Sequence, residues 1–427
     1  MTNPAGGGGG SSSSSSGPQR IIISINVLQL GIGIACCLFT IMNGAKCNPL
    51  QYTHRRLIGE AVFDVTRFGA KPDGKTDNAM SFIRAWAAAC RTVGGAKVLI
   101  PRGQFVASEV VFAGPCVARK PIIVEIQGNV LAYNDMSSYS GGAWIMVQRV
   151  DGIVITGGGT INGRGQEAWK YNSQGGPLLP VSVVLQTVQN AQVNFLNFVD
   201  SMGFHLKATD SSNINISNLK ILAPANSPNT DGIHMSSTIN INVTDTFIAT
   251  GDDCISVGHG NQNVLIARIT CGPGHGLSVG SLGKRPDETN LKGVTIINCT
   301  LTGTSNGARI KTYRASPHLS ASTIYFQDIV MNRVANPIII DQNYASKKKR
   351  QPSNVRLSDV HFRNIRGTTT SLVAVSLNCS STYPCVGVEL SNIDLRPLGR
   401  MPPLTSACSN ANFFLKGNVN PGPARCI

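Results

Sequence analysis

The chain has few charged and few aromatic residues for its length. Charged side chains make up 14% of its 427 residues and aromatic side chains 6%, with only three tryptophans. Glu, Lys, Ala and Leu at 3.6-residue spacing, the pattern of amphipathic helices, are sparse as well, which argues against a helical protein. Glycine, with 45 copies, and small polar residues are abundant instead. That composition is typical of many short strands separated by turns, and the chain is long enough to bury a sizeable core.

Signatures of nucleic-acid binding are also missing. The sequence has no RNA-binding signature, no zinc-finger spacing and no basic run interleaved with aromatics, so we expect no nucleic-acid partner. It is nevertheless basic, since 37 Lys and Arg outnumber 22 Asp and Glu for a net charge of +15. Such a charge steers polyanions toward a surface. An anionic lipid and an acidic polysaccharide therefore stay open as partners, as does the plain alternative that the charge only aids solubility.

The first 62 residues divide into three expected segments. Residues 1–20 form a low-complexity Gly/Ser extension that cannot build a core. Residues 21–45 contain the apolar run Ile21–Met42 behind Arg20, which predicts a signal peptide or an uncleaved signal anchor. Residues 46–62 are a processed or flexible lead-in, and residues 63–427 form the folded domain. We expect this domain to be secreted, with no integral membrane segment after signal cleavage.

The cysteines and glycosylation sites fit that compartment. Outside the apolar run, which holds Cys36 and Cys37, ten cysteines remain, an even number typical of an oxidising environment. Sequons for N-glycosylation begin at Asn215, Asn242, Asn298 and Asn378. We therefore expect a disulfide-bonded glycoprotein.

One strand-like phrase recurs through the second half of the chain. Taken at their central polar residue, its copies lie at Asn197, Asn218, Asp245, Arg268, Asn298, Asp328, Asp359 and Asn392. The copies are spaced 21 to 33 residues apart, and apolar residues alternate within each one, as in a strand with one buried face. A repeat of this length without helices between the copies predicts an all-β protein, a single parallel β-helix. A β-sandwich is disfavoured because its strands recur at shorter intervals.

One segment has a helical pattern. Within residues 78–90 the apolar side chains of Ala79, Phe82, Ile83, Trp86 and Cys90 fall on one stripe. A solenoid needs a cap where its first coil would otherwise expose core and unpaired backbone. We expect a short capping helix here, at the N-terminal end.

Three polar residues recur at the length of one coil. Asp231 and Asp253 are 22 residues apart, and His275 follows after another 22. Because neighbouring strands lie about 4.8 Å apart, their side chains should stack in a column on the outer face. Carboxylates this close raise each other's pKa and cost stability, which indicates a functional site. Asp252 can join Asp253 there only if the chain bends between them.

Two cations should complete this column. Arg309 and Lys311 are two residues apart on a predicted strand, so both face outward while Ile310 faces the core. Gly274 and Gly276, on either side of His275, would let a ligand approach the backbone closely. Carboxylates beside cations predict a site that binds an anionic substrate and does acid–base chemistry.

Four stretches that carry these residues resemble the motifs of polygalacturonases, the glycoside hydrolases that cleave pectin. They are SPNTDGIH (227–234), TGDDCISVG (250–258), CGPGHGLSVGSLGK (271–284) and NGARIKT (306–312). The resemblance runs from Phe63 to Cys426. It implies a right-handed parallel β-helix and hydrolysis of the α-1,4 bonds of polygalacturonic acid with inversion, in the extracellular space or cell wall, by a monomer without a cofactor.

The resemblance also implies roles for individual residues. Asp252 matches the general acid, and Asp231 and Asp253 match the carboxylates that hold and deprotonate the attacking water, in line with the two-carboxylate chemistry of inverting glycosidases. His275 matches a histidine that tunes the acid. The remaining matches concern the substrate: Arg309 and Lys311 bind its carboxylate, Tyr344 lines the cleft and Asn229 is a polar neighbour.

The chain departs from the family pattern at three places. Asn162 replaces a usual Asp, Ala345 replaces a usual Cys after the stretch 336–344, and the basic run Lys347–Arg350 follows. Several phrases, among them residues 250–264 and 373–395, resemble plant exo-acting members more than endo-acting ones. We therefore expect release of single galacturonate units, with endo cleavage as the alternative. A pectate lyase-like enzyme and a non-catalytic cell-wall β-helix are the remaining alternatives.

Spacing also suggests how the cysteines pair. Cys254 and Cys271 are 17 residues apart and should lie on adjacent coils beside the site. The other expected pairs are Cys379–Cys385, Cys408–Cys426 and Cys90–Cys116. Cys299 should be free and buried, and Cys47 should stay near the processed end.

Overall fold

A computed structural model describes residues 60–118, 121–172, 179–344, 351–422 and 426. The expected leader segments 1–20 and 21–45, most of the lead-in 46–62, Cys47, Ala345 and the run Lys347–Arg350 lie outside the described residues. Among those described, no helix is long and apolar enough to cross a membrane. The solenoid begins with β1 at Ala61, two residues ahead of the expected boundary.

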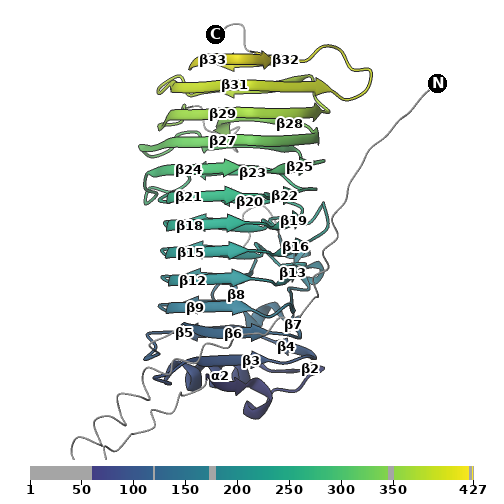
Figure 1. Ribbon diagram of the computed structural model, residues 1–427, viewed down its shortest axis with the longest axis vertical. Coiled ribbons are helices and arrows are strands. Elements are labelled where there is room, and N and C mark those ends of the chain that lie inside the picture. Colours follow the sequence, from purple (N-terminus) through teal and green to yellow (C-terminus); the bar gives the residue numbers. More distant parts are fainter. Residues whose placement is uncertain (1–59, 119–120, 173–178, 345–350, 423–425, 427) are drawn as a thin grey trace, which may run out of the picture. The chain divides into compact units, whose positions relative to one another are not determined.

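The described chain is a stack of coils made almost wholly of parallel strands (Figure 1). Most coils contribute two strands to a bent 22-stranded sheet and one to an 11-stranded sheet. The larger sheet contains β1 (Ala61–Asp64), β2 (Asp73–Asp77), β3 (Ala96–Ile100), β4 (Gln104–Ala107), β6 (Ile122–Ile126), β7 (Asn129–Ala132), β9 (Asp151–Thr156), β10 (Thr160–Asn162), β12 (Gln189–Asn194), β13 (Asn197–Val199), β15 (Ser212–Ser217), β16 (Lys220–Leu222), β18 (Ile239–Thr244), β19 (Phe247–Ala249), β21 (Gln262–Ala267), β22 (Thr270–Cys271), β24 (Leu291–Ile297), β25 (Thr300–Thr302), β27 (Leu319–Val334), β29 (Val355–Thr369), β31 (Cys385–Pro397) and β33 (Ala411–Asn420).

The smaller sheet carries most of the predicted site. It contains β5 (Val110–Ala113), β8 (Ala143–Gln148), β11 (Val181–Gln186), β14 (Leu206–Thr209), β17 (Ile233–Ser236), β20 (Ile255–Val257), β23 (Leu277–Leu282), β26 (Asn306–Tyr313), β28 (Asn336–Tyr344), β30 (Val373–Asn378) and β32 (Thr405–Ser409). All its pairings are parallel and follow chain order, so each strand lies directly over its counterpart in the coil before. The predicted parallel β-helix is therefore confirmed.

The core is a column of stacked aliphatic side chains. Alternate residues of each strand point inward, so that Ile214, Ile241 and Val264 on successive coils are fully or almost fully buried. Further along the stack Phe326 and Phe362 lie ring on ring, 5.2 Å apart. The period of two in the sequence produces this core, because every second side chain of a strand faces the same side.

Left-handed residues make the bend between the two strands that a coil gives to the larger sheet. In register these residues are Phe195, Asn218, Asp245, Arg268, Asn298, Asp328, Asn364 and Asn392, all with φ between 52° and 57°. The sequence alignment placed Asn197 and Asp359 in this column, and both assignments are wrong. Asn197 begins the next strand. Asp359 is also left-handed, but it lies in register with Thr323 and Gly387 of another bend, which the sequence pattern could not separate from the first.

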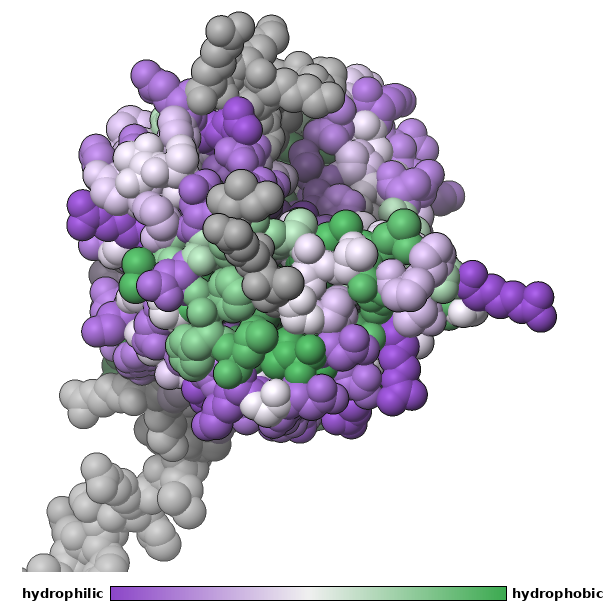
Figure 2. Space-filling model, turned by 90° about the horizontal axis from the view of Figure 1, so that it is seen from above, coloured by the Kyte–Doolittle hydropathy of each residue, from purple (hydrophilic) through white to green (hydrophobic). Residues whose placement is uncertain are grey.

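The expected N-terminal helix is present as α2 (Ala79–Cys90). Its buried face includes Phe82 and Trp86, and the Trp86 indole donates a hydrogen bond to the Ala113 carbonyl 3.0 Å away. Figure 1 shows this helix at the start of the stack. Figure 2 looks onto the opposite end, where apolar side chains gather, and there Phe414 and Leu415 of β33 are about half exposed. Only short 3₁₀ turns accompany α2 in the described chain, namely η2 (Val65–Phe68), η3 (Met136–Ser138), η4 (Gly165–Glu167) and η5 (Trp169–Tyr171).

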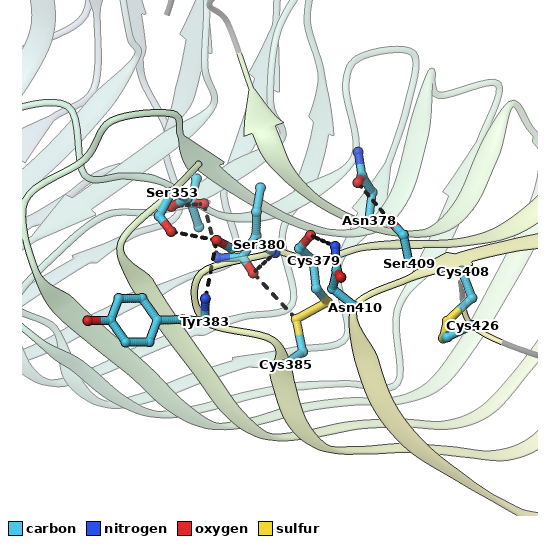
Figure 3. Close-up of a disulfide and its surroundings, with 12 residues drawn as sticks. Ser353, Asn378, Cys379, Ser380, Tyr383, Cys385, Cys408, Ser409, Asn410 and Cys426 are labelled. Carbon is cyan, nitrogen blue, oxygen red and sulfur yellow. Dashed lines mark hydrogen bonds between the residues drawn. A yellow bond between two sulfur atoms is a disulfide. The ribbon is translucent and has the colours of Figure 1, made fainter. Parts of the chain in front are cut away.

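The four predicted disulfides are present, and Cys299 is free and buried as expected. Figure 3 shows two of them, Cys379–Cys385 and Cys408–Cys426, on the last coils. Asn378, a sequon residue beside the first, is half-buried and accepts hydrogen bonds from Asn343 and Ser409, each 3.1 Å long. The other three sequon asparagines are exposed, so Asn378 is the least accessible to a glycan.

Candidate active site

Asp231, Asp253 and His275 occupy equivalent places on three successive coils. Each lies two residues before a strand of the smaller sheet, and those strands pair in register as Ile233, Ile255 and Leu277. The 22-residue spacing in the sequence therefore corresponds to one turn of the solenoid. The expected column is confirmed.

The chain bends at Gly251 and Asp252, so that two adjacent carboxylates face the same region. The Asp253 amide donates a hydrogen bond to the Asp252 side chain, 2.8 Å away. Ligand atoms of Asp252, Asp253 and His275 lie within 4.8 Å of one another. A Cβ on Gly251 would lie 2.0 Å from the Ser227 carbonyl oxygen, so glycine is required at the bend. The bend that the sequence analysis required for Asp252 and Asp253 to lie together is present.

Asp253 is the charge-balanced member of the cluster. Its side chain is 1% exposed and accepts hydrogen bonds from Arg309, from Lys311 at 2.7 Å and from the Ser278 hydroxyl at 2.9 Å. The Arg309 Nε donates to the same Ser278 hydroxyl at 2.8 Å. Since Ile310 is fully buried, Arg309 and Lys311 face outward together as predicted.

Asp231 is the member of the cluster that has no cationic partner among the described residues. It is 5% exposed, and the structure shows one hydrogen bond to its carboxylate, from the Ser256 hydroxyl at 2.7 Å. Burial, followed by the charges of Asp252 and Asp253, raises its pKa well above the ordinary value. Desolvation and like charges both favour the neutral acid, so Asp231 readily keeps a proton.

Asp252 lies at the rim, with its side chain 20% exposed, and is held by the imidazole Nδ1 of His275 at 2.8 Å. Burial opposes its ionisation. The hydrogen bond from His275, with the charges of His275 and Lys311, outweighs burial and lowers the pKa of Asp252. The pKa values of Asp231 and Asp252 are thus shifted in opposite directions.

Tyr344 and Asn229 border the cluster. The Lys311 ammonium lies 5.1 Å from the centre of the Tyr344 ring, which meets Tyr313 edge-on at 5.5 Å. Asn229 is exposed, and its amide donates to Asn172, 3.1 Å away, rather than to a carboxylate. Tyr344 thus contacts Lys311 directly, and Asn229 joins the site to Asn172, which follows η5.

A hollow of about 560 Å³ opens beside His275 toward the later coils. Its lining includes Pro273, Thr304, Arg333 and Thr370, which come from four successive coils. Hydroxyl groups and an exposed guanidinium suit a carbohydrate with acidic groups. On the side of the earlier coils, by contrast, Asn229 is in contact with the segment that contains η4 and η5.

Sequence reasoning missed three polar neighbours of the carboxylates. His234, Ser256 and Ser278 come three residues after Asp231, Asp253 and His275 on successive strands, and each is paired in register with the next. His234 Nδ1 contacts the Ser256 hydroxyl at 2.8 Å, and burial, with nearby cations, lowers the pKa of His234 to about 3. It is therefore a neutral imidazole. These residues repeat at the same 22-residue interval as the acids, which is the signal that could have found them.

The glycines beside His275 lie tightly against neighbouring coils. A Cβ on Gly276 would lie 2.0 Å from the Asn306 carbonyl oxygen, and one on Gly274 would lie 2.8 Å from that of Asp252. The neighbouring coils therefore require glycine at both positions. Gly274 also lines the hollow beside His275, so the approach of a ligand to this backbone stays a prediction.

The carboxylates and the imidazole have the ligand types of a cation site, but their charges are already engaged. Both oxygens of Asp253 bind a cationic side chain. A divalent ion there would face Arg309 and Lys311 at close range, which Coulomb repulsion opposes. The arrangement suits an organic anion beside a proton donor better than a metal ion.

Comparison with known proteins agrees with this geometry. Residues 90–419 match the model of Glycosyl hydrolases family 28. An Arabidopsis thaliana exopolygalacturonase is 41% identical over 84% of this chain and 87% of its own, and a Gossypium hirsutum polygalacturonase is 43% identical over 85% and 90%. The crystal structure of a Thermotoga maritima exopolygalacturonase matches with a TM-score of 0.69, over 84% of this chain and 92% of its own. At 17% identity this likeness shows the fold alone, a right-handed parallel β-helix. This chain therefore belongs to Glycosyl hydrolases family 28 and is a glycoside hydrolase.

Proposed function

We propose that the enzyme hydrolyses the α-1,4 bonds of polygalacturonic acid with inversion and releases single galacturonate units from the chain end. One observation carries this proposal: a buried carboxyl with a raised pKa and a rim carboxylate with a lowered one lie beside two cations. Carboxyls whose pKa values differ allow one to carry a proton while another is ionised, and the charge and exclusion of water that a bound substrate brings can change which of them carries it. The cations supply affinity for a substrate that carries a carboxylate on every unit.

Asp252 donates the proton to the leaving oxygen. It is the most exposed carboxyl of the three, and it lies beside His275 at the rim, where a glycosidic oxygen can approach. A bound substrate brings a negative charge and excludes water, and both effects raise the pKa of Asp252. Because the resting cluster favours the proton on Asp231 instead, the competing assignment makes Asp231 the acid.

Asp231 and Asp253 hold the attacking water. Asp253 is held in place by two cations and Ser278, so it can orient the water. Asp231, once it has lost its proton to solvent or to the neighbouring carboxylate, accepts the proton of that water. Positioning and proton transfer of this kind each accelerate a reaction considerably.

Arg309 and Lys311 bind the carboxylate of the unit on the leaving side. In the absence of substrate both are engaged with Asp253. An arginine has donors left after one such contact, and a lysine has three donors in all. A substrate carboxylate can therefore join the pair without displacing Asp253, next to the ring of Tyr344.

Attack at the chain end fits the asymmetry of the two sides of the site. A hollow extends beside His275 toward later coils, where the remainder of a polymer can lie. On the other side the segment Gly165–Tyr171 is anchored by the Trp169 indole on the Ser201 carbonyl at 3.1 Å and reaches Asn229 through Asn172. The 41% identity to an exopolygalacturonase supports the same mode.

The enzyme acts outside the cell, on the pectin of the cell wall. The four disulfides in the described chain suit an oxidising compartment, and the curated relatives are plant polygalacturonases. Secretion through the apolar segment 21–45 and a monomeric state belong to the same proposal.

Incubation of the purified enzyme with polygalacturonate tests the proposal. Reducing ends should rise steadily while viscosity falls slowly and single galacturonate units accumulate, with Asp252→Asn as the inactive control. A ladder of oligogalacturonides with a rapid fall in viscosity would establish endo cleavage instead. An ultraviolet-absorbing unsaturated product that forms only with Ca²⁺ would establish a lyase.

A further inference from the structure

A half-buried lysine lies in the same row of side chains as the site, at the end opposite to Arg309. Lys207 of β14 pairs in register with His234, which pairs with Ser256, then Ser278, then Arg309. Leu206 and Ala208, on either side of Lys207, are fully buried in the core, so the lysine points outward. The row thus has a cation at each end. Between the two cations lie Ser256 and Ser278, whose hydroxyls donate hydrogen bonds to Asp231 and Asp253.

Lys207 differs from the other cations of the site because no described residue forms a hydrogen bond or ion pair with it. Arg309 and Lys311 both hold Asp253. The charges that act on Lys207 come from Arg285, which disfavours its protonated form, and from Asp210, which favours it, while burial disfavours it most. A partly buried ammonium without a hydrogen-bond or ion-pair partner costs free energy. A ligand carboxylate would remove that cost.

Beyond Lys207 the row becomes apolar. Val184 of β11 pairs directly with Lys207, and Met146 of β8 pairs with Val184. Both belong to a small cluster on this face with Val181 and Phe204, and the Phe204 ring lies 5.1 Å from the imidazole of His234. Val181 and Val184 are buried and Met146 is half-buried, so the row offers a further acidic sugar unit no charged partner beyond Lys207.

We propose that Lys207 binds the carboxylate of the terminal galacturonate unit, on the far side of the scissile bond from the unit held by Arg309 and Lys311. The inference rests on the proposed function and adds to it the residue that recognises the chain end. Lys207 is two strands away from Ser256, the partner of Asp231, or about 10 Å. That interval has room for one sugar ring, which limits the released product to one unit.

The test replaces Lys207 by methionine, which keeps the apolar stem and removes the charge. The matched control is Lys220→Met, an exposed lysine of β16 in the other sheet. The two substrates are trigalacturonate and the same trimer with a methyl ester on its terminal, non-reducing unit. For Lys207→Met we expect kcat/KM on trigalacturonate to fall about 10- to 100-fold, the range of a lost charged hydrogen bond, with no fall on the esterified trimer. The control should match the wild type on both.

An equal loss on both substrates would overturn the inference, because a general structural defect does not distinguish a charged from a neutral terminal unit. No loss on trigalacturonate would overturn it as well. Calorimetric binding of trigalacturonate to Asp252→Asn and to Asp252→Asn/Lys207→Met gives a readout that needs no turnover: binding should weaken at least tenfold. If the wild type hydrolyses neither trimer, the proposed function fails, and this binding comparison still decides whether Lys207 holds a carboxylate.

Discussion

The protein contains two clusters of charged side chains that look alike in composition but differ in balance. In the catalytic cluster, Asp231 shares its space with two further carboxylates and has a strongly raised pKa. In a second cluster, on β29 and β31, Glu389 accepts a hydrogen bond from His361 at 2.5 Å and is paired with Arg363, and His361 also contacts Asp359 at 2.7 Å.

Both acids of the second cluster, Glu389 and Asp359, have side-chain hydrogen-bond partners. Burial opposes the ionisation of Glu389, but hydrogen bonds from Arg363 and His361 outweigh it and lower the pKa. The hydrogen bond from His361 lowers the pKa of Asp359 as well. Tyr325 covers the imidazole with its ring, 4.3 Å away and nearly parallel. A charged cluster with unbalanced carboxylates, like the one around Asp231, therefore indicates a catalytic site. A cluster whose charges are paired, like the one around Glu389, instead links neighbouring coils.

The largest difference between the clusters should be seen in turnover. Asp252→Asn removes the proposed proton donor and should lower kcat by about 10³- to 10⁴-fold, measured by reducing ends released from polygalacturonate. Glu389→Gln, the matched change in the second cluster, should leave kcat within about twofold. Near-normal turnover by a folded Asp252→Asn variant, with a large loss in Asp231→Asn, would transfer the role of acid to Asp231.

The disulfides near each cluster should stabilise the fold to different extents. Cys254–Cys271 closes 17 residues beneath the catalytic bend, and Cys379–Cys385 closes 6 residues at the start of β31. Chain entropy predicts losses of about 3 and about 2 kcal/mol when each pair is replaced by alanines. Denaturant unfolding measures both. Only the first replacement should also reduce activity, because Cys254 follows Asp253 directly, and unchanged activity would show that the bend holds without its disulfide.

The second cluster should contribute to stability in a pH-dependent way. Glu389→Gln should reduce the free energy of unfolding by about 2 kcal/mol at pH 7. The folded pKa of Glu389 is lowered, so its contribution is complete above the unfolded pKa of about 4.3 and disappears as the pH falls through the folded value. Unfolding curves of wild type and variant should thus converge in acid. If the free energies of unfolding of wild type and variant differed by the same amount at every pH, the loss would be due to packing and not to charge.

The catalytic cluster should show the opposite trend. Because the folded pKa of Asp231 is raised, its neutral form is favoured at low pH, and that advantage is lost as the pH rises through the folded pKa. Asp231→Asn should therefore be more stable than the wild type at pH 7, by about 1 kcal/mol, and lose this advantage near pH 3. Activity should be lost together with the gain in stability. A variant less stable than wild type at pH 7 would contradict the unbalanced charge.

The two clusters also differ in how far the sequence could predict them. Asp231, Asp253 and His275 lie on short coils without insertions, so a constant spacing of 22 revealed their column. Coils of the second cluster are longer, since Asn364 follows Asp328 by 36 residues in register, and two left-handed bends per coil made Asp359 look like the equivalent residue. The sequence could not show that Arg309 and Lys311 both bind Asp253, because that contact depends on side chains of coils two strands apart.

Proton NMR of polygalacturonate during the first minutes of digestion tests the central claim most directly. Hydrolysis with inversion by the carboxylate cluster predicts that the β-anomer of free galacturonate forms first and that the α-anomer follows only by mutarotation. Initial release of the α-anomer, or the vinyl proton signals of an unsaturated product, would contradict the account.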